Sequence, residues 1–397
     1  MPGAALGDRF GRRRVFELGL ALFTLASAAA ALAPGSGALV GARAVQGAGA
    51  ALVLPLSLTL LATAFPAERR GLALGIWSGI SGLAVALGPL VGGAVVDGIS
   101  WQWIFWLNVP LGLIVLPSAR AFLAESHGPR ERLDPLGLVL ATGGLLGVVW
   151  GVVRGNGSGW TSSEIIAALA GGGLLLVAFM IWESRTSAPM LPLRLFRSRA
   201  FSATNVVSLT MSFGIFGSIF LLAQFLQTVQ GYSAFDAGLR TLPWTLMPMF
   251  VAPVAGALSE RIGGRPLMAL GLALQSIAMV WLALIASVDV SYGRLVLPFV
   301  LAGTGMALVF APVANVMLAS VRPEQQGKAS GANNAIREVG GALGVAVLAS
   351  VFAGTGSYRS GQTFVDGLVP AVWTGAGVLA VGAALALLVP RAAGRRG

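Results

Sequence analysis

Residues 4–15 read AALGDRFGRRRV, and this charged stretch decides how the rest of the chain is interpreted. It gathers one aspartate and four arginines around two glycines at the start of a 397-residue chain that is otherwise largely apolar. A charged, glycine-containing run of this kind is typical of a short connection between two apolar segments. We therefore expect residues 4–15 to form a loop between membrane spans, although they stand at the beginning of the sequence.

The composition indicates a helical membrane protein. Hydrophobic residues make up 56% of the chain and charged residues only 10%, whereas soluble domains are about 25% charged. A helix needs ~20 mostly apolar residues to cross the bilayer, and continuous apolar runs without alternation exclude a transmembrane β-barrel. The predicted fold is all-α and polytopic, with twelve spans. These are 15–34, 38–64, 71–97, 103–119, 136–154, 164–183, 201–229, 235–258, 265–287, 292–318, 328–354 and 369–390.

The basic charge follows the membrane topology. If the first charged segment is cytoplasmic, most Lys and Arg residues fall in loops and tails on that side. Arg154, Arg240, Arg294 and Arg359 fall on the opposite side. The net charge of +11 therefore predicts a multi-pass protein of the cell membrane with both termini cytoplasmic. Nucleic-acid binding is excluded as a reading, because it needs arginines clustered on one face with aromatic residues between them.

The sequence offers few groups for covalent or metal chemistry. It has no cysteine and a single histidine, His127, in a predicted loop. We find no cluster of metal ligands, no nucleotide-binding loop and no nucleophile–base pair. We therefore expect no cofactor and no metal, and a polytopic membrane enzyme is the weakest of the readings considered.

The opening run has a second copy farther along the chain. Residues 4–15 align with GALSERIGGRPL at 256–267, which places Asp8 on Glu260 and Gly11 on Gly263. GAGAALVLP at 47–55 aligns with GTGMALVFA at 303–311, and GLALG…ALG at 71–88 aligns with GKASG…ALG at 327–344. Three matches in the same order, at offsets of 252, 256 and 256 residues, predict an internal repeat of the kind from which many secondary transporters are built.

The repeat also predicts that two spans are missing. The spans 201–229 and 235–258 precede the second charged loop, and their first-half counterparts would fall before residue 1. The intact architecture is then fourteen spans, with 1–117 as the remnant of the first bundle, 118–200 as a central helix pair with its loops and 201–397 as a six-helix bundle. A wrongly placed start and a true truncation both remain open.

At this point the chain resembles the major facilitator superfamily, specifically its fourteen-span drug:proton antiporter branch. The family's loop motif, approximately G-x-L-a-D-r-x-G-r-r, matches A-A-L-G-D-R-F-G-R-R here, with Ala4 in place of the first glycine. The resemblance implies that these charges form a latch that holds the outward-facing state. The alternative is a simple topology anchor made of positive charge. The latch residues would be Asp8, Arg9, Gly11, Arg12 and Arg13.

A second motif of the family, R-x-x-Q-G-x-G, lies near the start of the second span. Here it reads Arg43, Gln46, Gly47 and Gly49. A guanidinium inside a span is costly and usually faces a cavity or a partner. The resemblance implies that Arg43 and Gln46 take part in proton transfer, whereas the alternative is that Arg43 extends to the nearby interface. Glu338 is the one acid that we place well inside a span, and it is our candidate for the titrating carboxylate. The alternative that the resemblance implies is a carboxylate of the two missing first spans.

A third motif, G-x8-G-x3-G-P-x2-G-G, distinguishes exporters from importers within the family. It reads Gly75, Ala84, Gly88, Pro89, Gly92 and Gly93 here, with one glycine replaced by Ala84. Glycines let helices approach closely and Pro89 bends its helix, so the resemblance implies a hinge that seals one half of the cavity. The alternative is ordinary packing of small residues.

The predicted function is export of small hydrophobic or amphipathic compounds, including antibiotics, by proton antiport through alternating access. The expected partners are the substrate, protons and the lipid bilayer, and we expect a monomer. Buried amides and an indole among aromatic side chains suit an amphipathic molecule, although each polar group alone could instead join helices. The cavity candidates are Gln224, Gln227, Trp244, Asn315, Asn333 and Asn334. The competing hypothesis is a truncated or mis-started fragment that cannot transport.

Overall fold

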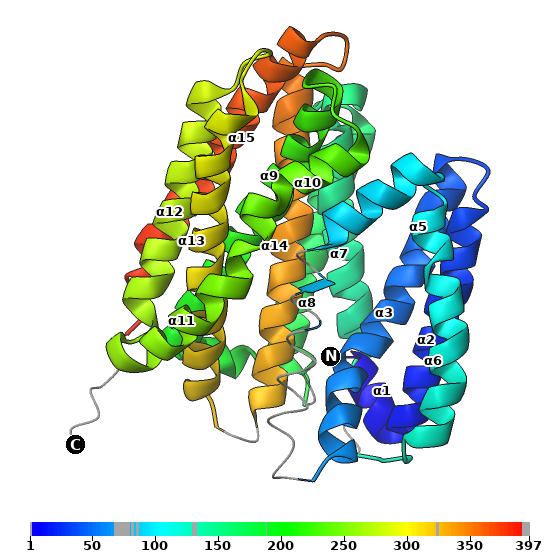
Figure 1. Ribbon diagram of the computed structural model, residues 1–397. Helices are drawn as coiled ribbons and strands as arrows, with labels where there is room; N and C mark the ends of the chain where they lie inside the picture. Colours follow the sequence, from blue (N-terminus) through cyan, green and yellow to red (C-terminus); the bar gives the residue numbers. More distant parts are fainter. Residues whose placement is uncertain are drawn as a thin grey trace. The chain divides into compact units, whose positions relative to one another are not determined.

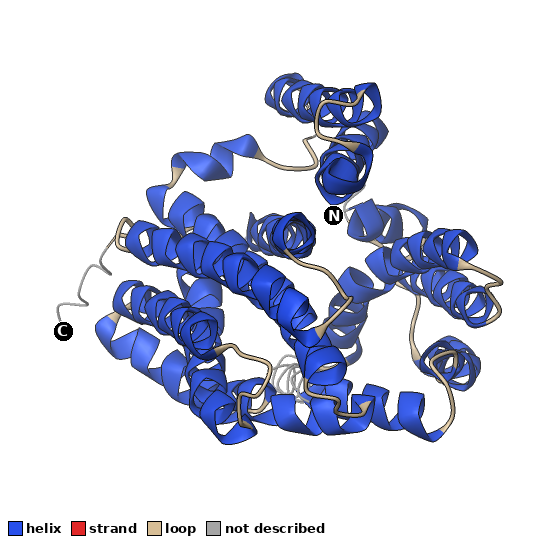
Figure 2. Ribbon diagram, turned by 90° about the horizontal axis from the view of Figure 1, so that it is seen from above, coloured by secondary structure: helices blue, strands red, loops and turns tan. Residues whose placement is uncertain are grey.

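The computed structural model describes residues 2–66, 80, 83–84, 87–128, 133–187, 189–322 and 325–390. Within these ranges the regular structure is helical throughout (Figure 2). Eleven helices of the described residues are long and apolar enough to cross a membrane, and Leu87–Gly98 is a shorter apolar helix. This confirms the predicted all-α, multi-pass membrane fold. The predicted span 71–97 lies partly outside the described residues. The chain divides into two compact units, Met1–Leu138 and Val139–Gly397.

The first unit is built around a closely packed helix pair. Its labelled helices are α1 (Pro2–Phe10), α2 (Arg12–Ala31), α3 (Ser36–Ala64), α5 (Trp103–Trp106) and α6 (Asn108–Phe122) (Figure 1). α2 packs along α3 and also contacts α6, while α1 contacts both members of the pair. Val15, Phe16, Leu56, Leu60 and Ala119 form the buried apolar cluster that joins α2, α3 and α6.

The expected loop at 4–15 is wrong, because the stretch is helical on both sides of a single residue. α1 ends at Phe10 and α2 begins at Arg12, with Gly11 between them at φ 105°. Glycine adopts a positive φ at little cost, so one residue is enough to redirect the chain. Arginine has a high helix propensity, so the charged run does not prevent a helix from forming around it.

The second unit contains, among the described residues, a helix pair followed by seven helices, of which the second and third together make up one candidate span. The pair is α7 (Pro135–Ser158), which begins just before the unit boundary, and α8 (Ser163–Arg185). The others are α9 (Arg199–Gln224), α10 (Ala234–Thr245), α11 (Met247–Ile262), α12 (Gly264–Ile285), α13 (Tyr292–Ala319), α14 (Gln326–Thr355) and α15 (Gly361–Ala386). A 3-10 turn, Leu193–Arg197, precedes α9 and a π-helical turn, Phe225–Val229, follows it.

Two sets of helices hold the second unit together. α9 packs along α14, while α12 packs along α13 on one side and α15 on the other (Figure 1). A single large core of buried apolar residues runs through them, including an aromatic cluster in which the Phe352 and Phe364 rings lie 4.8 Å apart. In a bilayer, close packing of this kind replaces the hydrophobic effect as the main force between helices.

The last helix begins eight residues before the predicted span 369–390, at Gly361. Its first turns carry polar residues, Gln362 and Asp366 among them, which lower the local hydropathy and conceal the helix start. The Ser360 hydroxyl accepts a hydrogen bond from the Thr363 amide, and the Thr363 hydroxyl accepts one from the Ser360 amide. Such a capping box fixes a helix N-terminus even where the sequence is polar.

A short polar tie joins α7 to α14. The Asn156 side-chain amide donates hydrogen bonds to the backbone carbonyl and the hydroxyl of Ser350. The Trp160 indole in turn donates to the Asn156 carbonyl oxygen at 2.9 Å. The C-terminal end of α7 is therefore bonded to the C-terminal part of α14 within the same unit.

The predicted repeat has matching local structure in the two units. Gly263, the equivalent of Gly11, also stands alone between two helices and also has a positive φ, 83°. The pair α2–α3 corresponds to α12–α13, and α2–α6 corresponds to α12–α15, each of which is in contact. The two copies therefore share their helix order and their closest helix pairs.

Glycine contacts match as well. A Cβ on Gly49 would lie 2.8 Å from the Gly19 carbonyl oxygen, and a Cβ on Gly305 would lie 2.4 Å from that of Gly271. Gly19 and Gly271 are 252 residues apart, and Gly49 and Gly305 are 256 apart, which are the offsets of the repeat. Both helix pairs approach so closely because small residues stand at the crossing.

Candidate functional site

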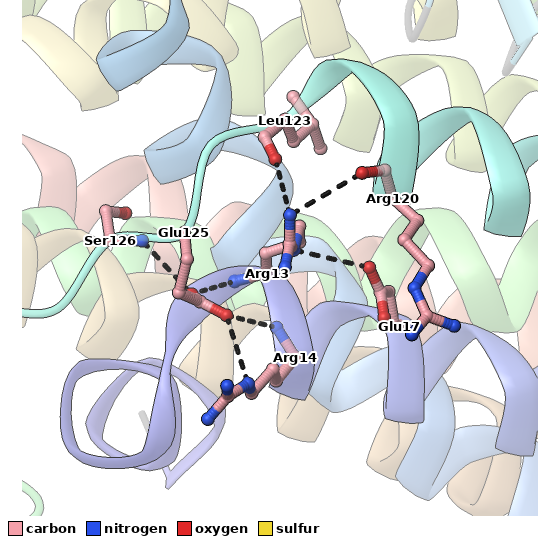
Figure 3. A network of polar contacts seen from close by, with 7 residues as sticks. All are labelled: Arg13, Arg14, Glu17, Arg120, Leu123, Glu125 and Ser126. Carbon is pink, nitrogen blue, oxygen red and sulfur yellow. Dashed lines mark hydrogen bonds and ion pairs between the residues drawn. The ribbon is translucent and has the colours of Figure 1, made fainter.

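The loop motif forms a polar cluster with the segment that follows α6 (Figure 3). The Glu125 carboxylate accepts hydrogen bonds from the backbone amides of Arg13, at 3.0 Å, and Arg14, at 3.3 Å. The Arg14 guanidinium lies 3.7 Å from the same carboxylate. The first amides of a helix have no partner within the helix, so this carboxylate satisfies them and also opposes the positive end of the helix dipole.

The Arg13 side chain fastens the same two segments together. Its Nη1 donates to the Leu123 carbonyl at 3.1 Å, and its Nε lies 3.5 Å from the Glu17 carboxylate. Gly11 is required at its position for a second reason besides its φ. A Cβ there would lie 2.9 Å from either oxygen of the Glu125 carboxylate.

Asp8 stands at a helix C-terminus. The residue lies in the last turn of α1, and the carboxylate at the N-terminus of α2 is that of Glu125. The reason is that α1 continues through Asp8 up to Phe10. Asp8 accepts a hydrogen bond from Arg12 Nε at 2.7 Å, while Arg9 is exposed. Among the predicted latch residues, Asp8, Gly11, Arg12 and Arg13 therefore belong to one cluster.

The second motif forms a polar chain within the first unit. Arg43 Nη1 donates to Gln46 Oε1, and Gln46 Nε2 donates to the Ser27 hydroxyl at 2.6 Å. Asn108 Nδ2 donates to the same hydroxyl at 3.0 Å, and the Arg43 guanidinium lies 5.8 Å from the centre of the Phe105 ring. Gln46 and Ser27 are buried, whereas the residue Arg43 as a whole is exposed. The chain thus leads from an accessible guanidinium into the contact between α2, α3 and α6.

The equivalent positions of the second unit are apolar. Ser27 corresponds to Met279, Arg43 to Phe299 and Gln46 to Ala302, from the repeat offsets. All three of these second-unit residues are at most 1% exposed. The same pair of helices therefore packs without any polar group at these positions, so the fold does not require the polar chain of the first unit.

The third motif lies only partly within the described residues. Gly75 lies outside them, whereas Gly88, Pro89, Gly92 and Gly93 stand on the helix Leu87–Gly98. A Cβ added at Gly88 or Gly92 would meet no described atom within 4 Å. The close helix contact expected at these two glycines is therefore not seen among the described residues, and the hinge stays a prediction.

The second unit has a pocket of about 210 Å³ between α9, α13 and α14. Its polar residues stand on one face of α14, and its remaining walls come from apolar side chains of the other two helices. The lining residues are Met211, Phe310, Val313, Ala314, Met317, Ser330, Asn333, Asn334 and Arg337. The Arg337 guanidinium lies 4.8 Å from the centre of the Phe310 ring.

The two asparagines of this pocket have different environments. Asn333 is 7% exposed, and its Nδ2 donates to Asn205 Oδ1 at 3.1 Å and to the Ser208 hydroxyl at 2.7 Å, which ties α14 to α9. Asn334 is exposed. The pocket therefore has one asparagine that is committed to helix packing and one that is free to meet a ligand.

The other predicted cavity residues do not join this pocket. Gln224 accepts a hydrogen bond from the Tyr358 hydroxyl, and Gln227 is exposed on the π-helical turn. Trp244 is 3% exposed and packs against Phe299 with ring centres 5.9 Å apart. Asn315 donates to the Ser259 hydroxyl at 3.4 Å. Glu338 is exposed and is not among the pocket's lining residues.

A cation–aromatic cluster stands at the beginning of α10. The Arg240 guanidinium lies 3.7 Å from the Tyr232 ring centre and 5.5 Å from that of Tyr292, and it pairs with Asp236 at 3.1 Å. The third tyrosine of the chain, Tyr358, stands in the loop between α14 and α15, outside the spans. Its hydroxyl donates a hydrogen bond to Gln224 on α9, and burial raises the pKa of this hydroxyl. The cluster connects Tyr232, just before α10, with Arg240 and Asp236 on α10 and with Tyr292 on α13. No sequence motif predicted it.

Several site residues escaped the sequence analysis. Glu125 was missed because it stands in a loop far from the motif that it caps, and Ser27 because a single serine in an apolar span carries no signal. Arg337 stands inside the predicted span 328–354, but it was not among the predicted cavity residues. One available signal was overlooked: LGLAL occurs at both 18–22 and 270–274, and it marks the glycines of the two helix crossings.

Residues 1–345 match the family model described as Major Facilitator Superfamily. The chain is 36% identical over 364 residues to a tetracenomycin C resistance and export protein of Streptomyces glaucescens, covering 91% of this chain and 66% of that protein. It is 37% identical over 355 residues to the multidrug resistance protein Stp of Mycobacterium tuberculosis, covering 89% and 66%. It is 39% identical over 369 residues to the cephamycin export protein CmcT of Amycolatopsis lactamdurans, covering 91% and 75%. The chain thus spans just under two thirds of the length of the first two relatives.

Solved structures share the fold. A crystal structure of the peptide transporter POT in complex with sulfate matches with a TM-score of 0.67 at 19% identity, over 97% of this chain and 81% of that one. A bacterial homolog of the human lysosomal transporter Spinster matches with a TM-score of 0.68 at 17% identity, over 97% and 84%. At these identities the likeness concerns the fold alone.

Proposed function

The chain belongs to the Major Facilitator Superfamily, and from this premise we propose that it exports small hydrophobic or amphipathic compounds, antibiotics among them, in exchange for protons. The names of its relatives, which include export and resistance proteins for antibiotics, support export as the direction. They also favour a transporter over an enzyme. The observation that carries the proposal is the polar chain Arg43–Gln46–Ser27 in the first unit.

This chain is costly and has no structural necessity. A guanidinium within a span costs about 2.5–3.5 kcal/mol on insertion scales, and buried amides and hydroxyls must be kept bonded. The second unit builds the same helix pair with Met279, Phe299 and Ala302 at the corresponding positions. A costly polar group that the fold does not need is best explained by a function. Arg43 would hold water or tune a nearby carboxylate during proton transfer, and Gln46 would orient its guanidinium.

The titrating carboxylate in this proposal is Glu338. It stands in the thirteenth position of α14 and is exposed on the helix surface. Each proton that moves inward releases ~2.3 kcal/mol per 100 mV of membrane potential. An export reaction coupled to that movement can accumulate substrate outside several-fold.

Alternating access would use the other two motifs. The cluster of Asp8, Arg12, Arg13 and Glu125 would act as the latch that holds one state closed, because it ties the start of α2 to the segment after α6. The helix with Gly88, Pro89, Gly92 and Gly93 would act as the hinge. Both termini would be cytoplasmic, and the protein would act as a monomer.

The test is substrate efflux from right-side-out membrane vesicles that are preloaded with substrate and hold the protein as it stands. We expect efflux of an amphipathic dye such as ethidium that stops when a protonophore collapses the proton gradient. Arg43→Ala should abolish efflux without lowering expression, whereas Arg294→Ala, an exposed arginine on α13, should leave it unchanged. Efflux that survives collapse of the gradient would disprove proton coupling.

A further inference from the structure

The pocket of the second unit contains a positive charge, on Arg337, that takes part in no salt bridge within 4.0 Å among the described residues. Arg337 Nε is buried and has no hydrogen-bond partner among the described residues. The salt bridges among the described residues involve other arginines, namely Arg12, Arg13, Arg14, Arg154 and Arg240. Glu338 is next to Arg337 in sequence, but it does not line the pocket.

The charge is also deep. Arg337 stands eleven residues after the start of α14 at Gln326, which at 1.5 Å per residue is about 17 Å along the helix. The hydrocarbon layer is ~30 Å thick, so Arg337 stands near the middle of a span that begins at the start of α14. An arginine this deep usually faces a partner or a substrate pathway.

From these observations we propose that the pocket around Arg337 binds an ionised acid, a carboxylate or phenolate, carried by an aromatic substrate; the transport of that substrate rests on the function proposed above. The geometry suits such a group. The Arg337 guanidinium lies against the Phe310 ring, and stacking of this kind leaves the N–H edge of the guanidinium available for a bidentate carboxylate.

Further donors stand on the same helix face. Ser330, Asn334 and Arg337 are spaced four and three residues apart, so their side chains follow one stripe of α14. The hydroxyl of Ser330 and the amide of Asn334 can each donate to an acid oxygen. Asn333 is excluded from this role as a donor, because its amide already bonds to Asn205 and Ser208.

The opposite wall suits an aromatic ring. Met211, Val313 and Met317 contribute flexible or compact apolar surface. At about 210 Å³ the pocket is smaller than the ~300–1,000 Å³ typical of sites for whole drug-sized ligands. It therefore takes the acidic ring of a substrate, while the remainder of a larger molecule extends beyond it.

The experiment compares three small probes that share the naphthalene ring and carry an anionic, a neutral or a cationic substituent: 2-naphthoate, its methyl ester and 2-naphthylmethylammonium. Binding is measured by calorimetry on the purified protein in phosphatidylcholine nanodiscs. We expect 2-naphthoate to bind at least tenfold more tightly than the ester or the amine. Arg337→Gln should abolish this preference, Arg337→Lys should retain part of it, and Arg294→Gln, which changes an exposed arginine, should leave it intact.

A second variant guards against a loss of fold. Asn334→Asp adds a negative charge at an exposed position of the pocket and should weaken 2-naphthoate several-fold while it strengthens the amine. Circular dichroism and size exclusion confirm that each variant is folded. The inference is overturned if the wild type shows no preference for the acid, or if folded Arg337→Gln keeps it.

Two further results separate the explanations. Binding of 2-naphthoate that is lost in phosphatidylglycerol nanodiscs at high salt, where repulsion by the bilayer surface is screened, would identify an anionic lipid headgroup as the occupant and would overturn the substrate assignment. Because binding needs no proton gradient, its outcome is independent of the efflux assay. Efflux that does not depend on protons would disprove the proposed coupling without affecting the preference for acids. Proton-dependent efflux without a preference for 2-naphthoate would overturn the present inference and leave the proposed function standing.

Discussion

Gly11 and Gly263 hold the same unusual backbone conformation 252 residues apart, each with a positive φ between two helices. Around each of them a charged segment leads into a helix that packs closely on the next. Two copies of one unit explain this better than chance, because the helix order and the glycine crossings agree as well. The units differ where they carry polar groups, and those differences lead to most of the predictions below.

The helix crossing of the first unit should not accept a side chain at Gly49. A Cβ there would lie 2.7 Å from the Phe23 amide nitrogen, whereas a Cβ at Gly47 meets nothing within 4 Å. We expect Gly49→Val to destabilise the protein by about 1–3 kcal/mol through overpacking and Gly47→Val to have little effect. Thermal unfolding in detergent, followed by fluorescence, compares the two. Equal melting temperatures would show that α2 and α3 do not approach as closely as described.

Glu125 should stabilise the start of α2. Glu125→Gln keeps the size of the side chain but removes the charge that opposes the helix dipole and Arg14, so we expect a loss of about 0.5–2 kcal/mol. Glu164→Gln is the control, because Glu164 forms an ion pair with Arg154 in which both side chains are about half exposed. The difference in melting temperature measures the effect, and it should shrink at high salt. A larger loss in the Glu164 variant would contradict the capping role.

Ser27 should be important for both stability and efflux, because its hydroxyl accepts two hydrogen bonds of the polar chain. Ser27→Ala removes the acceptor that Gln46 and Asn108 share, and it should lower stability by about 1–2 kcal/mol and impair efflux. Ser57→Ala on α3 should change neither, because the Ser57 hydroxyl donates only within its own helix. Efflux and melting temperature are measured on the same preparations. An unaffected Ser27 variant would mean that the polar chain is incidental.

Asn333 and Asn334 should separate stability from binding. Asn333→Leu breaks the bonds from α14 to Asn205 and Ser208 and should cost about 1–2 kcal/mol. Asn334→Leu, at the exposed neighbouring position, should leave the melting temperature unchanged while it weakens 2-naphthoate. If both variants melt early, Asn334 also serves the packing of the helix and the division between the two residues fails.

Hydropathy and the internal repeat were the two features of the sequence from which the fold could be predicted. Long apolar runs predicted the spans because a helix in lipid must be apolar over a fixed length, and the repeat predicted the matching helix pairs. The loop at 4–15 was mispredicted because charge density signals a membrane edge and not the end of a helix. The start of α15 was mispredicted for the opposite reason, since polar first turns interrupt the hydropathy signal.

The site was only partly accessible. Motifs marked Arg13 and Gln46 because their spacing is local. Glu125, which accepts a hydrogen bond from the Arg13 amide, and Asn108, which shares the Ser27 hydroxyl with Gln46, come from segments far along the chain. No periodicity identifies which distant loop will reach a helix end. Amides in the spans were equally ambiguous, because a sequence does not distinguish an amide that joins helices, such as Asn333, from one that lines a pocket, such as Asn334.

The tie from Asn156 to Ser350 has a mechanical consequence. When α14 tilts or slides, α7 must move with it or the two hydrogen bonds must break. The pair α7–α8 is therefore expected to move together with α14. A compound that separated Asn156 from Ser350 would then let α14 move without α7, and it would do so without entering the Arg337 pocket.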